Sequence, residues 1–299
     1  MLKKIAINKY DVIVVGGGHA GIEASLASAR MLCTTLLVTL KANAIGRMSC
    51  NPAIGGTAKG HLVREIDAFG GEMGKLADAT GIQFKMLNKS KGPAVWSPRS
   101  QNDRELYSAE AQKRILNQNN IDVIEGSVSK LLVDGNKLIG IKTLLGEEIF
   151  CESLVLCAGT FLNGLMHTGE KNRIGGRFGE APSTGITEIL NKIGFVSGRL
   201  KTGTPPRVEL NSIDLSKVER QESDEFPTPF SFQNTEIKNR LIPMYLTYTN
   251  HHTHKILEKG FDRSPMFTGR IKGIGPRYCP SVEDKVFRFA ERERHQIFL

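Results

Sequence analysis

Apolar positions along the chain fall into short continuous runs and into stretches with helical spacing. Residues 12–15 form a β-branched apolar run, which is typical of a strand buried on both faces of a parallel sheet. Residues 19–31 read as an alanine-rich helix, and residues 35–40 as a second buried strand. The succession of strand, helix and strand predicts a βαβ unit at the N-terminus.

Helical spacing returns twice in the next part of the chain. Residues 61–69 have the pattern of a short amphipathic helix that ends at Gly70-Gly71, and residues 105–117 place apolar side chains on one helical side. Residues 121–125 read as a third strand. The βαβ pattern therefore continues with further helical cover for the sheet.

Antiparallel pairing is predicted after that third strand. Residues 128–133 and 137–142 flank Asp134-Gly-Asn136, whose turn chemistry indicates a hairpin. Strands over 148–151 and 153–159 follow, the second ending in a small-residue turn. This order is that of two-dinucleotide-binding flavoproteins. The predicted fold class is α/β: a Rossmann-like FAD-binding domain with an antiparallel β-meander and an inserted smaller α+β domain.

The pattern becomes more polar and less periodic towards the C-terminal third. A helix is predicted from Ser183 or Thr184 to Gly194, and the character changes near Arg199. We predict an FAD-binding domain over 1–200, an inserted smaller domain over 201–272, and a return into the FAD domain over 273–299, incomplete at its C-terminus. The last residues read as the start of an apolar strand.

A glycine turn joins the first strand to the first helix. Gly16, Gly18 and Gly21 have the G-x-G-x-x-G spacing, which permits a tight turn, a close approach of backbone to phosphate, and packing of the helix on the strand. The free amides and the positive dipole end of the helix point at the same place. No carboxylate follows the second strand to bind a ribose, and Thr39 or Asn43 is the candidate replacement.

Two loops carry candidate chemistry. Residues 44–60 are rich in Gly and Pro, and hold Cys50 near Arg47 and Lys59, whose charges favour a thiolate; the alternative is a small buried cysteine. Residues 86–104 surround the single tryptophan with cations, which suits phosphate contact and base stacking; the alternative is a basic surface loop.

A second cysteine lies ahead of a predicted helix. Ser281 and Asp284 have capping spacing, so Cys279 precedes a helix N-terminus, where the dipole favours a thiolate. The His251, His252 and His254 group has no accompanying carboxylate or cysteine cluster. We therefore predict a solvated histidine segment there and no metal site.

Composition narrows the class of protein. The 299 residues carry a net charge of +9, from 40 Lys and Arg against 31 Asp and Glu, which indicates either a polyanionic partner or a solvated basic surface. Five cysteines without a C-x-x-C pair argue against a disulfide framework or a zinc site. No apolar run approaches the roughly 20 residues of a membrane span. These features predict an intracellular, cytoplasmic protein.

Six segments together resemble one family. They are Gly-Gly-Gly-His-Ala-Gly (16–21), Met-Ser-Cys-Asn-Pro-Ala-Ile-Gly-Gly (48–56), Lys-Gly-Pro-Ala-Val (91–95), Arg-Leu-Lys-Thr-Gly-Thr-Pro-Pro-Arg (199–207), Asp-Arg-Ser-Pro-Met (262–266) and Gly-Pro-Arg-Tyr-Cys-Pro-Ser-Val-Glu-Asp-Lys (275–285). In this order they resemble the MnmG family, also called GidA. The likeness covers essentially the whole chain. Family members continue past the position of Leu299, so we expect this chain to match their N-terminal portion.

The resemblance implies site residues. FAD binding is implied for Gly16, Gly17, Gly18, His19, Ala20 and Gly21, with Val128 and Ser183. The stretch 275–289 matches a segment assigned to NAD binding, which implies Gly275, Pro276, Arg277, Tyr278, Pro280, Ser281, Glu283, Asp284 and Lys285. Cys50 and Cys279 match two functionally required cysteines. We expect one of them to add to C6 of uracil and the other to serve proton transfer or elimination.

The resemblance also implies an activity and partners. The family uses FAD and NADH to add a carboxymethylaminomethyl or aminomethyl group to C5 of the wobble uridine of tRNA, with methylenetetrahydrofolate as the one-carbon source. A GTPase partner, MnmE, and a homodimer are implied as well. Two other functions stay open at this point: a flavin-dependent oxidoreductase acting on a small molecule, and a non-catalytic module that binds FAD or tRNA.

Overall fold

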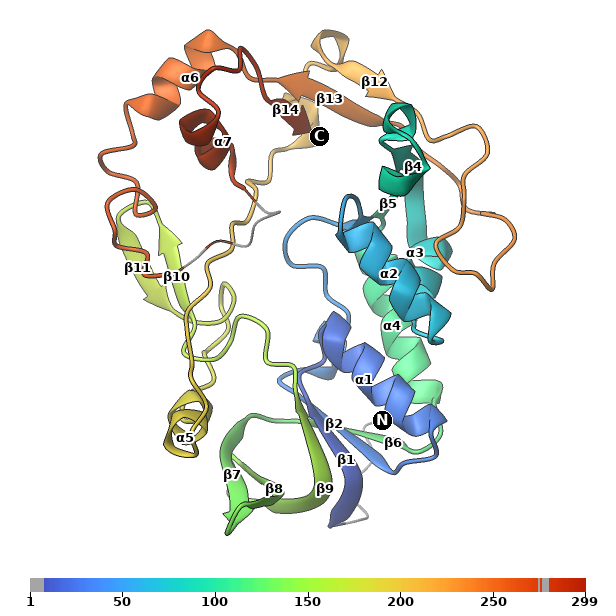
Figure 1. Ribbon diagram of the computed structural model, residues 1–299, viewed down its shortest axis with the longest axis vertical. Coiled ribbons are helices and arrows are strands. Elements are labelled where there is room, and N and C mark those ends of the chain that lie inside the picture. The colour runs from blue at the N-terminus through green and yellow to red at the C-terminus, as the bar shows by residue number, and fades with distance from the viewer. Residues whose placement is uncertain (1–7, 274, 276–279) are drawn as a thin grey trace.

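A six-stranded sheet forms one end of the molecule (Figure 1). The computed structural model describes residues 8–273, 275 and 280–299. The strands are β1 (Lys9–Val15), β2 (Thr35–Thr39), β6 (Ile121–Glu125), β7 (Val128–Asp134), β8 (Lys137–Thr143) and β9 (Glu148–Leu156), in the order β6-β2-β1-β9-β8-β7. The first four in that order are parallel, and β8 and β7 add an antiparallel meander. The predicted fold class is confirmed.

The two strands predicted over 148–151 and 153–159 are one strand, β9. Its first residues pair antiparallel with β8, through Ile149 with Ile141 and Phe150 with Gly140. The same strand pairs parallel with β1 from Phe150 through Leu156. β8 and β1 lie on opposite sides of β9, and Phe150 pairs with both, so the two predicted strands form one continuous strand.

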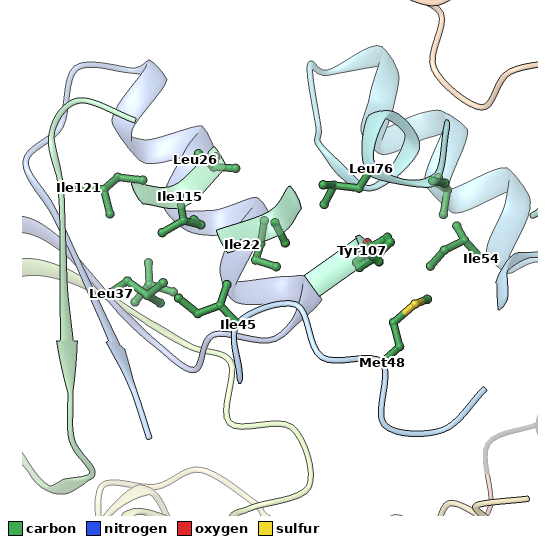
Figure 2. Packing of buried hydrophobic residues seen from close by; sticks show 14 of the residues in the cluster. Ile22, Leu26, Leu37, Ile45, Met48, Ile54, Leu76, Tyr107, Ile115 and Ile121 are labelled. Carbon is green, nitrogen blue, oxygen red and sulfur yellow. The ribbon is translucent and has the colours of Figure 1, made fainter. Parts of the chain in front are cut away.

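Both faces of the sheet are covered, which explains why its strands read as continuous apolar runs. Leu37 faces a core made with α1 (His19–Arg30) and α4 (Arg104–Asn117), where it packs with Ile22 and Ile115 (Figure 2). Its neighbours Leu36 and Val38 face the opposite core, which includes residues of the meander and of α5 (Ile186–Lys192). Each such buried side chain stabilises the fold by roughly 1.5–3 kcal/mol.

A second, three-stranded sheet lies beside this core. It consists of β3 (Ala53–Gly55), β5 (Ser97–Asn102) and β4 (Gly81–Leu87), in that order, with α2 (Lys59–Ala68) and α3 (Met73–Thr80). The loops predicted over 44–60 and 86–104 are therefore wrong in part, and α3 lies outside any predicted helix. Strand β5 is polar yet buried: Asn102 Nδ2, for example, donates to Ala77 O and Thr80 Oγ1, both at 3.1 Å.

The remaining elements continue around an open outline to the far end (Figure 1). They are the hairpin β10 (Leu165–Thr168) and β11 (Lys171–Ile174), the sheet β12 (Glu219–Gln221), β13 (Met244–Tyr248) and β14 (Gln296–Phe298), and the helices α6 (His251–Glu258) and α7 (Val282–Arg288). Short 3-10 turns are η1 (Ala42–Ala44), η2 (Lys89–Lys91), η3 (Pro93–Val95), η4 (Leu210–Ser212) and η5 (Leu215–Lys217).

The last strand, β14, pairs with β13 through Leu246 with Phe298 and Tyr248 with Gln296. It therefore belongs to the three-stranded sheet and not to the six-stranded one. The domain boundaries at 200 and 272 stay a prediction. Helix α5 begins at Ile186 instead of near Ser183, because Gly185 at its N-cap has a φ of 94° that ends the preceding extended backbone.

Carboxylates hold the segment that precedes β13 against α3. Asp78 accepts hydrogen bonds from Phe230 N at 2.7 Å, Ser231 N at 2.9 Å and Asn234 Nδ2 at 2.8 Å. Burial raises the pKa of Asp78, and these three donors act in the opposite direction. Arg64 of α2 donates to Pro229 O at 2.7 Å. The segment from 229 to 234 is thereby attached to the N-terminal part of the fold. Within the described residues, no helix is long and apolar enough to cross a membrane.

Candidate functional site

The glycine turn lies where β1 meets α1 at the carboxyl edge of the sheet. A Cβ on Gly21 would lie 1.7 Å from Gly16 O, and one on Gly16, at a φ of 113°, would lie 2.2 Å from Cys157 O. These two glycines are therefore required by packing. A Cβ on Gly18 would meet nothing within 4 Å, so the turn presents open space at that position.

The start of α1 leaves backbone donors at the same place. Ile22 N makes the first helical bond, to Gly18 O at 2.9 Å, so the amides of His19, Ala20 and Gly21 precede the helical ladder. The N-cap residue of α1 is Gly18, which has no side chain to accept a hydrogen bond from these amides. Free amides at a helix N-terminus, next to open space, suit a bound phosphate.

His19 connects the turn to the loop that carries Cys50. Burial lowers the pKa of His19 to about 4, and the charge of Lys59 acts in the same direction. Its Nδ1 lies 3.3 Å from the hydroxyl of Tyr107, whose pKa is raised by burial. Lys59 in turn has a pKa lowered by burial, with the charge of Cys50 acting in the opposite direction. The turn, Lys59 and Cys50 therefore form one electrostatic neighbourhood.

A segment from the C-terminal half covers Cys50. We call residues 199–207 the strap. Cys50 Sγ donates to Gly203 O at 3.4 Å, and Arg207 Nη2 donates to Cys50 O. Arg47, which the sequence placed near the thiol, pairs with Glu180 at 3.0 Å. Lys59 Nζ donates to Ala53 O at 2.9 Å.

The other end of the strap contacts the segment that the resemblance assigns to NAD. Lys201 Nζ pairs with Asp284 Oδ2 at 3.1 Å, and a Cβ on Gly275 would lie 2.9 Å from Lys201 Cε. The strap therefore touches both the Cys50 loop and the flanks of the Cys279 segment. Cys279 itself, with Pro276, Arg277 and Tyr278, lies outside the described residues.

The described residues of that segment surround the start of α7. Ser281 Oγ accepts from Asp284 N at 3.2 Å, which confirms the predicted cap, and also lies 3.3 Å from Glu283 Oε2. Asp284 is buried, and Pro280 is exposed. Lys285 follows Asp284 on the helix and is unpaired among the described residues. The capping residues have a structural role that is independent of any ligand.

Val128 and Ser183 flank the contact between Ser129 and Gly185, although they are far apart in sequence. Val128 is buried in the second core cluster at the start of β7. Ser183 bonds through its backbone to Phe161 O and from Asn163 N, both at 2.9 Å. Gly185 packs against Ser129 O, where a Cβ would lie 3.1 Å away. Their assignment to FAD stays a prediction.

A carboxylate that the sequence reasoning missed stands beyond the end of β2. Thr39 is buried against Gly17, and Asn43 is exposed in η1. Glu125, at the end of β6, pairs in register with Thr39, and its Oε1 accepts from Ala42 N at 2.7 Å. A carboxylate therefore lies beside the end of the second strand, where it binds the backbone of η1. The signal was a third parallel strand ending in Glu.

Residues 86–104, which surround Trp96, are only partly available to a ligand. Arg99 has a pKa lowered by burial, donates to Gln221 Oε1 at 2.9 Å and lies 4.3 Å from the ring centre of Phe298. Lys89 pairs with Asp224 at 3.1 Å. Trp96 is 42% exposed. Neither alternative left open describes Arg99, because its guanidinium is used inside the fold.

Comparison with known proteins identifies the family. The model of the family described as "Glucose inhibited division protein A" matches residues 11–299. The chain belongs to the MnmG family, also called GidA. A relative from Cytophaga hutchinsonii, named tRNA uridine 5-carboxymethylaminomethyl modification enzyme MnmG, is 56% identical over 97% of this chain and 47% of its own length. A relative of the same name from Protochlamydia amoebophila is 53% identical over 100% of this chain and 48% of its own.

Solved structures agree with the MnmG assignment. Aquifex aeolicus GidA in its form I crystal is 48% identical, with a TM-score of 0.90 over 97% of this chain and 50% of that one. Its form II crystal gives 44% identity and a TM-score of 0.88, over 99% of this chain and 48% of that one. This chain therefore spans about half the length of its MnmG relatives.

Proposed function

We propose that this chain forms the FAD- and NADH-binding part of an enzyme that modifies tRNA. The reaction adds a carboxymethylaminomethyl or aminomethyl group to C5 of the wobble uridine. MnmG relatives at 56% and 53% identity carry the first of these activities in their name. The single observation that best supports the proposal is the geometry of the glycine turn, in which Gly16 and Gly21 are required by packing and Gly18 faces open space, as a dinucleotide pyrophosphate needs.

FAD fits the glycine turn of this chain. The open space at Gly18 and the uncapped start of α1 suit its pyrophosphate, which Gly16, Gly17, Gly18, His19, Ala20 and Gly21 would hold. Val128 and Ser183 are proposed as further contacts. When bound, FAD would supply two-electron redox chemistry.

NAD(H) is assigned to the segment at the start of α7. The proposed residues are Gly275, Pro276, Arg277, Tyr278, Pro280, Ser281, Glu283, Asp284 and Lys285. The contacts of Lys201 with Asp284 and Gly275, and of Gly203 with Cys50, support this assignment, because the strap links that segment to the thiol.

The chemistry requires activation of uracil at C5. The sulfur of Cys50 or Cys279 bonds to C6, and the C5–C6 electron pair moves towards C5 and O4. C5 then bonds to a one-carbon unit of methylenetetrahydrofolate and loses its proton to the other cysteine or to water. The C5 electron pair then expels the folate nitrogen to leave a methylene group on C5, and the amine of glycine or ammonium bonds to that methylene carbon. The sulfur–C6 bond finally breaks as the C5–C6 double bond re-forms. The net charge of +9 supports tRNA as the polyanionic substrate. The MnmE GTPase and a homodimer are proposed from the family.

Two cysteine variants test the proposal. Cys50→Ser and Cys279→Ser, made separately in the protein at the length its gene encodes, should keep bound flavin and lose modification. Flavin absorbance reports the first, and mass spectrometry of tRNA nucleosides the second. Cys33→Ser is the control, because Cys33 lies between α1 and β2, away from the strap. Modification retained by both cysteine variants would remove the proposed nucleophile.

Two further measurements separate the alternative functions. Bleaching of bound flavin by NADH distinguishes a redox enzyme from a non-catalytic binding module. Binding of tRNA that weakens steeply with salt distinguishes a tRNA enzyme from an oxidoreductase acting on a small molecule.

A further inference from the structure

A hollow of about 440 Å³ lies between α7 and the β13–β14 pair, at the end of the molecule opposite the large sheet (Figure 1). Its lining includes the cations Lys285, Arg292 and Arg294 and the aromatic rings of Tyr248 and Phe289. This volume is within the range of small-molecule sites. None of the three cations forms an ion pair within the described residues.

The two arginines are held in place by aromatic rings. The guanidinium carbon of Arg294 lies 4.4 Å from the ring centre of Tyr248, and that of Arg292 lies 5.5 Å from the ring centre of Phe289. Stacking reduces the conformational entropy that each side chain would lose on binding a ligand. Guanidinium groups held this way favour planar, bidentate recognition of phosphate.

The residue His295 lines the same hollow and is itself buried. His295 is 6% exposed, and its Nε2 has no hydrogen-bond partner within the described residues. Its backbone N donates to Thr249 Oγ1 at 2.8 Å, which fixes the position of the residue. Burial lowers the pKa of His295, as do the charges of His254, Lys285 and Arg292, while Glu291 acts in the opposite direction. A neutral imidazole with an unpaired buried nitrogen costs stability unless a ligand or water pairs with it.

Helix α7 presents different faces to the hollow and to the strap. Lys285 and Phe289 are four residues apart, on one helical side, and both line the hollow. Asp284 is turned towards Lys201 of the strap and is also approached by Arg288 at 3.6 Å. The hollow is therefore separate from the contacts that connect α7 to the Cys50 loop.

We propose that this hollow is a nucleotide subsite, in which Arg292, Arg294 and Lys285 bind a phosphate while Tyr248 and Phe289 contact a planar base. The residues Tyr248, Arg292, Arg294 and His295 lie outside the segment 275–289, so they extend nucleotide recognition onto β13 and the approach to β14. This subsite depends on the proposed function in one respect, because the proposed function supplies its two candidate ligands, NADH and tRNA.

The test measures binding directly. The double variant Arg292→Gln/Arg294→Gln is compared with Lys217→Gln/Arg220→Gln, which removes the same charge from exposed residues outside the hollow. Both are made in the FAD-loaded protein at the length its gene encodes. Three probes are titrated: NADH, a single-stranded RNA oligonucleotide and ADP. We expect at least tenfold weaker binding of one or more probes to the hollow variant, with unchanged flavin content, and a change below about twofold in the control.

Each outcome decides between the two proposals. Weakening for NADH alone assigns the hollow to the dinucleotide, and weakening for RNA alone assigns it to tRNA. If the unaltered protein binds ADP through these arginines but neither NADH nor RNA, the subsite stands and the proposed function fails. Binding of every probe to the hollow variant within twofold of the unaltered protein overturns the subsite.

Discussion

The glycine turn after β1 and the basic hollow beside α7 both concentrate positive potential, but one does so with backbone amides and the other with side chains. In the turn, the backbone atoms of Gly16 and Gly21 approach so closely that no side chain fits. In the hollow, Arg292 and Arg294 are exposed. A site made of backbone is tied to the packing of the fold, whereas a site made of exposed side chains can change with little effect on stability.

The largest effect expected from this comparison is at Gly21. A Cβ there would lie 1.7 Å from Gly16 O, so Gly21→Ala must push α1 away from β1 and should lower the free energy of unfolding by about 4 kcal/mol. The matched control is Gly18→Ala, where the added methyl meets open space. That control should cost less than about 1 kcal/mol. Urea unfolding followed by circular dichroism measures both, and equal values would contradict the packing argument.

The strap connects the two regions, and its ion pair should give the next largest effect. The side chains of Lys201 and Asp284 are 18% and 8% exposed. Lys201→Met leaves Asp284 with only the exposed Arg288 nearby, and should lower the free energy of unfolding by about 2–3 kcal/mol. Lys217→Met, in an exposed pair with Asp214, should have no measurable effect. A silent Lys201→Met variant would show that the strap is not held by this pair.

The glycine turn would bind through backbone atoms but also contains one titratable side chain, His19. Its pKa is about 4 in the fold and about 6.5 when unfolded, so protonation favours the unfolded chain. Its contribution is complete above about pH 6.5 and is lost as the pH falls towards about 4. Between about pH 7 and about pH 5 the loss should be roughly 2 kcal/mol.

The His19→Gln variant removes this titrating group. Urea unfolding of the protein without cofactor, at several pH values, should therefore show a shallower loss of stability on acidification for the variant. The unaltered protein and the variant should diverge in slope below about pH 6.5. Parallel profiles would mean that another group carries the pH dependence.

The smallest effect is expected in the hollow. Arg294→Gln removes an exposed guanidinium that stacks on Tyr248, and should change the free energy of unfolding by less than about 0.5 kcal/mol. Thermal or urea unfolding checks this. A loss comparable with that of Lys201→Met would place Arg294 in the support of the fold and weaken the contrast between the two regions.

Local rules predicted the elements on which the turn depends. The run 12–15, the glycine spacing and the alanine-rich helix each depend on neighbours a few residues away, and the Ser281 cap follows from a three-residue spacing. The hairpin of β7 and β8 follows from the turn chemistry at Asp134-Gly-Asn136 for the same reason. The side of the site made by β1 and α1 was therefore predictable in detail.

Long-range partners were not predictable in this way. Strand β5 is polar, and its burial depends on hydrogen bonds such as that from Asn102 to Ala77, which no periodicity reveals. Glu125 acquires its place only because β6 lies next to β2. The strap was recognised as a motif, but its contact with Cys50 depends on how distant segments pack.

The contact between Cys50 and Gly203 joins positions 153 residues apart in the chain. The glycine turn can close on its own neighbours early in folding, whereas this contact requires two segments separated by about half of the chain to come together. The rate at which an alkylating reagent modifies the Cys50 sulfur during refolding would therefore decline when the strap arrives. A single thiol in this way becomes an internal chemical marker for the order of assembly.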